Sequence, residues 1–191
     1  MGFVTEANLK LTKAPQNVRV AVTQFPTVHD AVRFAVKVIQ GGHQLEAMEL
    51  LDNITMRALN AGGYYEQELP EKPTVFLKLA GHTTDDVQNQ AKVVSGIAKS
   101  AQSLSFTLAK DTEEGETLWA ARKTALWSAL ALKYNADDRF LAADACVPVS
   151  KLGVIIERTH AMLEESGLFG CCVGHVGDGK MNARQICYEH G

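Results

Sequence analysis

The 191-residue chain carries a formal net charge of −3, with 46% hydrophobic and 21% charged residues. These proportions are ordinary for a folded globular protein. They supply no broad basic surface, so we exclude nucleic acid and anionic lipid as partners. No apolar run approaches the roughly 20 residues needed to cross a bilayer, and no membrane span is expected.

Residues 2–11 (GFVTEANLKL) have the pattern of a strand from the first residues on. A short connector with Pro15 follows, and we place a domain boundary there. We therefore expect residues 1–14 to be the last strand of an otherwise missing domain. A targeting segment is expected to be missing with it, because no leader pattern is visible.

The main domain, expected over residues 15–179, alternates apolar-periodic strands with amphipathic helices. Strands are predicted at 18–25, 45–51, 74–80, 104–109, 142–147 and 168–173. Helices are predicted at about 28–40, 53–60, 83–101, 112–133 and 148–165. The pattern dissolves beyond Gly174, so residues 180–191 are expected to be a divergent C-terminal tail.

This order of elements favours an α+β fold of the ferredoxin-like type. Two β-α-β units whose strands interleave form an antiparallel sheet with helices packed on one face. A doubly wound parallel sheet would need continuous apolar strands and a glycine-rich phosphate turn after the first of them. The sequence has neither feature.

The most suggestive local stretch is the glycine-rich turn at 174–179 (GHVGDG). A tight turn of this kind can aim the imidazole of His175 at a metal or a substrate, although an incidental histidine in a surface turn is equally compatible with the pattern. The stretch also approaches a phosphate-binding loop through Lys180. Met181 replaces the hydroxyl that would bind Mg²⁺, which disfavours a nucleotide site.

The predicted helix at 112–133 places Trp119, Arg122 and Leu126 on one face. An arginine on a mostly apolar face can bind a substrate carboxylate through two hydrogen bonds. The alternative is an arginine that pairs with a structural acid or extends to solvent. The four cysteines form no Cys-x-x-Cys pair and are interpreted as reduced, small buried residues.

Five segments in order resemble the flavin-linked oxidase family, most closely its D-lactate-oxidising branch. They are residues 2–7 (GFVTEA), 45–52 (LEAMELLD), 118–123 (LWAARK), 146–152 (CVPVSKL) and 174–179 (GHVGDG). Together they span about residues 1 to 179. An ordered set of motifs is much more specific than any one of them.

The resemblance implies a two-domain FAD enzyme in which this chain is the substrate domain that covers the flavin. The family oxidises D-2-hydroxy acids, as in D-lactate to pyruvate, and passes electrons to an acceptor such as cytochrome c. It further implies a mitochondrial location and is compatible with a homodimer. The chain alone is expected to be inactive. The alternative is a non-catalytic fragment that binds a carboxylate or a partner.

The resemblance also implies roles for single residues. Gly2, Phe3 and Val4 would contact FAD, and Arg122 would bind the substrate carboxylate. His175 would be the first of two histidine ligands to a divalent metal such as Zn²⁺.

In this chain the position of the second ligand is Asn182. Glu189 and His190 echo the family's later Gly-Glu-His-Gly, which implies a metal ligand and a general base. Arg122 and His175 are thus expected to line one hydroxy-acid pocket.

Overall fold

The computed structural model describes residues 2–11, 13–63, 68–131 and 139–187. Its centre is one seven-stranded sheet in the order β4-β1-β3-β2-β6-β7-β5. All strand pairings of the described sheet are antiparallel. The strands are β1 (Asn17–Gln24), β2 (Ala47–Leu51), β3 (Thr74–Gly81), β4 (Ser105–Leu108), β5 (Arg139–Cys146), β6 (Phe169–His175) and β7 (Lys180–Cys187). The expected antiparallel α+β fold is confirmed.

Five α-helices of the described chain connect these strands, and a 3₁₀ turn leads into the last of them. They are α1 (Val28–Gln40), α2 (Asn53–Ala61), α3 (Thr84–Ser100), α4 (Thr112–Ala131), η1 (Val149–Lys151) and α5 (Leu152–Glu165). Side-chain caps fix three of the helix starts, because Thr27, Asp52 and Thr83 each accept a backbone N–H of the first turn. None of the described helices combines the length and apolar character that a bilayer span requires.

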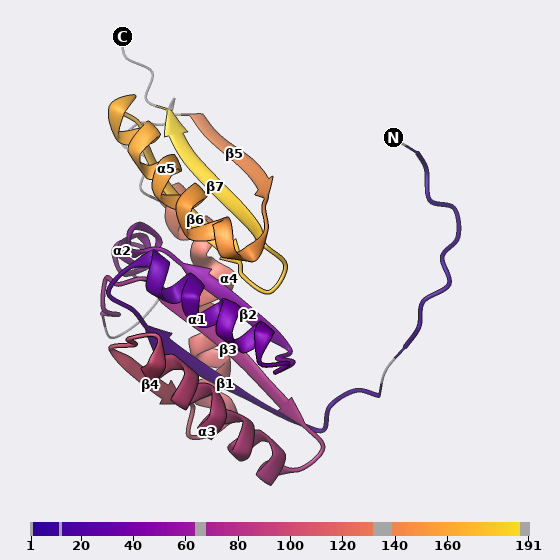
Figure 1. Ribbon diagram of the computed structural model, residues 1–191. Helices are drawn as coiled ribbons and strands as arrows, with labels where there is room; N and C mark the ends of the chain where they lie inside the picture. Colours follow the sequence, from indigo (N-terminus) through magenta and orange to yellow (C-terminus); the bar gives the residue numbers. More distant parts are fainter. Residues whose placement is uncertain (1, 12, 64–67, 132–138, 188–191) are drawn as a thin grey trace.

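The helices lie on both faces of the sheet, whereas the sequence predicts them on one. Helices α1, α3 and α5 cover one face, which lies in front in Figure 1, and α4 lies behind the sheet, where it contacts α2 and β1. Strand β3 shows the division, since Val75 and Leu77 join the core under α1 while Phe76 joins the smaller cluster against α4. The one-face expectation therefore describes only α1, α3 and α5.

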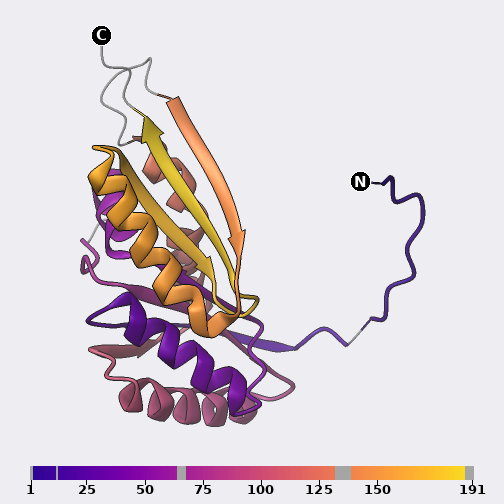
Figure 2. The same ribbon diagram turned by 45° about the horizontal axis from the view of Figure 1, so that its top comes forward.

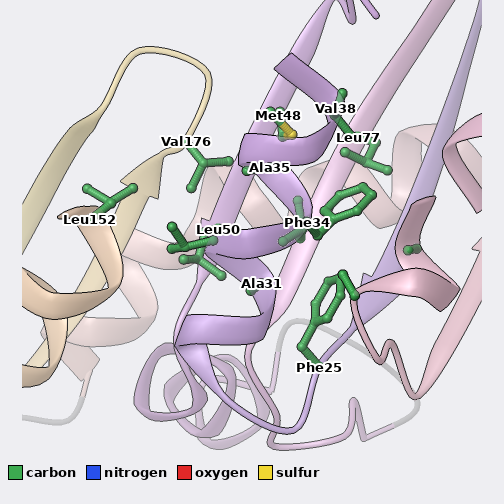
Figure 3. Packing of buried hydrophobic residues seen from close by; sticks show 14 of the residues in the cluster. Phe25, Ala31, Phe34, Ala35, Val38, Met48, Leu50, Leu77, Leu152 and Val176 are labelled. Atoms are coloured by element: carbon green, nitrogen blue, oxygen red, sulfur yellow. The ribbon is translucent and has the colours of Figure 1, made fainter. Parts of the chain in front are cut away.

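The core face is closed and apolar. Phe34 of α1 and Leu50 of β2 are fully buried, and both lie within the packed cluster of Figure 3. Phe25 and Phe34 hold their ring centroids 5.4 Å apart, a normal separation for a favourable aromatic pair. This cluster continues across the sheet to Leu152 of α5, so one core joins both halves of the chain.

The expectation that the pattern dissolves beyond Gly174 is wrong. Lys180–Cys187 forms β7, which pairs with β6 on one side and β5 on the other. Its buried Met181 and Ala183 alternate with Asn182, which is the period of a strand with one apolar face. Gly179 permits the tight turn into β7, because its φ is 69° and an added Cβ would collide with the carbonyl of Val147.

Residues 2–11 contain no strand in the structure, contrary to the expectation. The segment lies away from the body of the molecule in both ribbon views (Figures 1 and 2). Phe3 and Val4 are exposed. Its interpretation as the end of a flavin-binding domain stays a prediction.

Candidate functional site

A row of polar side chains crosses the sheet on the α4 side, and it begins with Glu49 in β2. Because strand residues alternate between faces, Met48 and Leu50 enter the core while Glu49 points to the opposite face. Its side chain is only 15% exposed. A carboxylate at such a depth needs charged or hydrogen-bonding partners.

Arg122 of α4 is the first partner of Glu49. Its Nη2 lies 3.3 Å from Glu49 Oε2, and the arginine side chain is only 17% exposed. The Nε atom of Arg122 is buried and has no hydrogen-bond partner in the described structure. The guanidinium therefore keeps donor capacity beyond its single long contact with Glu49.

His175 ends β6 directly opposite Glu49 in the strand register. Its Nδ1 lies 2.9 Å from Glu49 Oε2 and 3.0 Å from Oε1. Its other ring nitrogen, Nε2, lies 3.0 Å from Nδ2 of Asn182. The structure thus brings the two predicted site residues, Arg122 and His175, to one carboxylate on one side of the sheet.

Lys180 and Asp144 continue the row toward the sheet edge. Lys180 of β7 pairs with His175 of β6 in register, so the two side chains share a face. Lys180 Nζ lies 3.2 Å from Asp144 Oδ2 on β5. We call the six residues of this row the polar stripe: Glu49, Arg122, His175, Asn182, Lys180 and Asp144.

Trp119 anchors α4 above the sheet one turn before Arg122. The ammonium of Lys78 lies 4.3 Å from the centroid of the Trp119 ring, a cation–π contact. Trp119 also packs against the cluster that contains Phe76. These contacts position α4 so that Arg122 reaches Glu49.

A pocket of 590 Å³ opens beside the stripe. It exists because β2 pairs with β6 only over Glu49–Leu51, so that Ala47 and Met48 have no partner in β6. Its lining includes Glu49 and His175 of the stripe, together with His43 and Asp178. A small polar ligand can reach the Glu49–His175 pair from this side.

The metal site predicted at His175 does not fit the residues that the structure describes. Both imidazole nitrogens are hydrogen bonded, one to Glu49 and one to Asn182. An amide is not among the ligands that hold zinc in proteins. Glu189 and His190, the other predicted members of this site, lie outside the described residues.

A different trio in the described chain could suggest a metal, namely Asp52, His160 and Cys172, whose donor atoms lie within 4.8 Å of one another. The carboxylate of Asp52 is already occupied, with His160 Nε2 at 2.7 Å and the backbone N–H of Cys172 at 2.6 Å. Thr55 donates twice to its other oxygen. Burial, with the nearby charge of Asp52, strongly raises the pKa of the Cys172 thiol. The trio is therefore a structural hydrogen-bond cluster.

The predicted flavin contacts lie in the N-terminal segment of the chain. Gly2, Phe3 and Val4 are exposed in an extended segment. Their role as flavin contacts stays a prediction.

The cysteine prediction holds for Cys171 and Cys172, which are buried in β6, but Cys146 is exposed. Sequence reasoning missed Glu49 as a site residue. The available signal was a single acid between apolar residues of a buried strand.

Comparison with known proteins places this chain in a family. A model described as FAD linked oxidases, C-terminal domain, matches residues 14–189. Over 186 residues the chain is 39% identical to D-lactate dehydrogenase (cytochrome), mitochondrial, of Kluyveromyces lactis, and 38% identical to D-lactate dehydrogenase (cytochrome) 1, mitochondrial, of Saccharomyces cerevisiae. Each alignment covers 96% of this chain and 32% of the relative. The chain thus spans about a third of the length of these relatives.

The fold is also similar to solved structures. An alkyldihydroxyacetonephosphate synthase superposes with a TM-score of 0.68 and 12% sequence identity, over 93% of this chain and 38% of that protein. At this identity the likeness concerns the fold alone.

Proposed function

The chain belongs to the FAD linked oxidase C-terminal domain family, and from this premise we propose that it is the substrate-binding part of a flavin enzyme that oxidises D-lactate to pyruvate. The observation that carries the proposal is the meeting of Arg122 and His175 at the carboxylate of Glu49. The names of its relatives support D-lactate as the substrate, a cytochrome as the electron acceptor and the mitochondrion as the location.

Arg122 binds the carboxylate of the hydroxy acid in this proposal. Its Nη2 contact with Glu49 is long, at 3.3 Å, and its buried Nε has no partner in the described structure. A substrate carboxylate can accept two parallel N–H bonds from a guanidinium. The low exposure of Arg122 strengthens such a bond, because little water screens the charges.

His175 orients the hydroxyl end of the substrate, since it lies on the same carboxylate as Arg122 and lines the adjoining pocket. When bound, the flavin accepts the hydride that leaves the α-carbon of the hydroxy acid. His190 as general base, and Gly2, Phe3 and Val4 as flavin contacts, complete the proposal as predictions from the resemblance.

Flavin reconstitution followed by addition of D-lactate tests this function. If the protein holds FAD and D-lactate bleaches its yellow colour, the enzyme assignment is supported. A protein that binds D-lactate but never holds a reducible flavin would favour the alternative, a carboxylate-binding fragment without catalysis. L-lactate is the control for stereochemistry.

Replacing Arg122 with lysine tests the carboxylate contact in the chain itself. Lysine keeps the charge but cannot form the two parallel bonds. We expect Arg122→Lys to weaken D-lactate binding by ~1.5–3 kcal/mol, measured by NMR titration. Arg57→Lys is the matched control, because Arg57 forms an exposed ion pair with Glu71. Equal affinities of wild type and Arg122→Lys would remove Arg122 from the site.

A further inference from the structure

The imidazole of His175 is hydrogen bonded at both nitrogens within the polar stripe. We propose that this chain has a metal-free form of the site, in which Glu49 and Asn182 fix the tautomer of His175 and leave neither ring nitrogen for a metal. Glu49 is then a positioning residue, since it orients both His175 and Arg122. The proposal uses the location of the hydroxy-acid site proposed above but does not depend on flavin chemistry.

The hydrogen-bond partners determine which nitrogen of His175 carries the proton. An ionised carboxylate only accepts hydrogen bonds, so Nδ1, at 2.9 Å from Glu49 Oε2, must donate. In a neutral ring Nε2 is then an acceptor. Asn182 fits this acceptor because its Nδ2 lies 3.0 Å away and carries two hydrogens. The three side chains therefore form one consistent donor–acceptor series.

A neutral imidazole binds a metal through its unprotonated nitrogen, which here is Nε2. That lone pair is the one that Asn182 occupies. A metal would have to displace the amide, and it would gain no ligand from it, because zinc sites use thiolate, imidazole and carboxylate groups. Asn182 thus occupies the nitrogen of His175 that would bind a metal, and its own side chain does not supply a second metal ligand.

The surrounding charges also oppose a divalent cation. The ammonium of Lys180 pairs with Asp144, and the guanidinium of Arg122 contacts Glu49. The carboxylate of Glu49 is shared between Arg122 and His175. Both carboxylates of the stripe therefore already have basic partners, which disfavours a divalent cation.

The protonation state of His175 can be read directly in this chain by ¹⁵N NMR of its imidazole, with His175→Gln to assign the signals. We expect one dominant neutral tautomer with the proton on Nδ1 and a hydrogen-bonded, unprotonated Nε2. A dominant tautomer with the proton on Nε2 would overturn the proposal, because Asn182 could not then be donating to that atom.

Zinc titration tests the second half of the proposal. Stoichiometric Zn²⁺ should leave the His175 signals of the wild type unchanged, whereas Asn182→His should bind Zn²⁺ at His175 at least about tenfold more tightly. Asn89→His adds a histidine at an exposed position of α3 and is the matched control. A shift of the wild-type His175 signals at one equivalent of Zn²⁺ would overturn the proposal.

A second variant keeps the test decisive if Asn182→His does not fold. Asn182→Asp has almost the same volume and replaces the amide with a carboxylate ligand, so we expect it to bind Zn²⁺ more tightly than the wild type as well. Absence of any gain in the variants that fold would show that Asn182 is not what keeps metal away. The readouts are the imidazole signals and the bound metal, so these results are independent of whether the enzyme assignment is correct.

Discussion

The two faces of the sheet have different roles, since one holds the main apolar core and the other holds the polar stripe. The face under α1, α3 and α5 holds an apolar cluster that includes Phe34, Leu50 and Leu77, all fully buried. The face toward α4 holds a smaller apolar cluster next to the polar stripe. Burial of apolar area provides most of the stability of a domain, whereas recognition needs a few placed polar groups. Alternation along each strand lets one sequence supply both.

Strand β2 shows this division between adjacent residues. Leu50 is fully buried in the core, while the side chain of Glu49 lies on the other face and contacts Arg122 and His175. A slip of one residue in the β2–β6 register would exchange the two faces. The position of the site therefore depends on the same register that builds the core.

The largest expected effect on stability comes from a substitution that distinguishes Leu50 from its neighbour Glu49. Leu50→Ala should lower the free energy of unfolding by about 2–5 kcal/mol, because it leaves a cavity in a closed core. Glu49→Gln keeps the volume and leaves the apolar core unchanged, but it removes the charge that holds Arg122 and leaves a largely buried guanidinium without its acid. Urea unfolding measures the loss of stability in Leu50→Ala. NMR titration measures how Glu49→Gln changes the affinity for D-lactate, which we assign to Arg122.

The comparison would fail if Leu50→Ala, still folded, changed D-lactate binding as strongly as Glu49→Gln does. Binding would then depend on the core as much as on the stripe. Val93→Ala is the control for stability, since Val93 is an exposed apolar residue of α3 and should have little effect on unfolding.

Sequence periodicity predicted most of the core face, because strands and helices with one apolar side have clear patterns. Strand β7 was missed because its pattern is weak. The short Met181–Ala183 alternation marks its buried side. The motifs also identified Arg122 and His175. Their partner Glu49 lies 73 and 126 residues away from them in sequence, so only the three-dimensional register of β2 and β6 brings it to the site.

The two faces are joined by Asp52, which follows β2 and caps α2. It is fully buried, and it links α2 through Thr55, β6 through the N–H of Cys172, and α5 through His160. Both carboxylate oxygens of Asp52 accept hydrogen bonds from backbone N–H groups, those of Thr55 and Cys172. An asparagine in its place would turn its NH₂ group toward one of these N–H groups. This makes Asp52 a structural residue even though it lies within a possible ligand trio.

Asp52→Asn should therefore lower the free energy of unfolding by about 1.5–3 kcal/mol, the usual value of a hydrogen bond to a charged group. Urea unfolding at neutral pH measures this loss. Asp85→Asn is the control, because Asp85 is exposed in the first turn of α3. If Asp52→Asn instead left stability unchanged and lowered zinc affinity, the trio would have to be regarded as a metal site.

The smallest effect concerns the one thiol of the core cluster, Cys172. Burial raises the pKa of this thiol above its ordinary value of 9.0. Above that pH the unfolded chain loses the proton while the folded chain keeps it, so unfolding becomes more favourable as pH rises. The sign is therefore a loss of stability at alkaline pH, of about 1.4 kcal/mol for each pH unit between the two pKa values.

Cys172→Ala isolates this effect because it removes the Cys172 thiol and leaves the other titrating groups of the chain in place. Between pH 7 and pH 10 the wild type should lose about 1.4 kcal/mol more unfolding free energy than the variant, as measured by urea unfolding at each pH. The absolute stability of Cys172→Ala can differ from the wild type without affecting this difference. Parallel pH profiles would mean that water reaches the thiol, and the α5 side of the sheet would then not be the closed face described above.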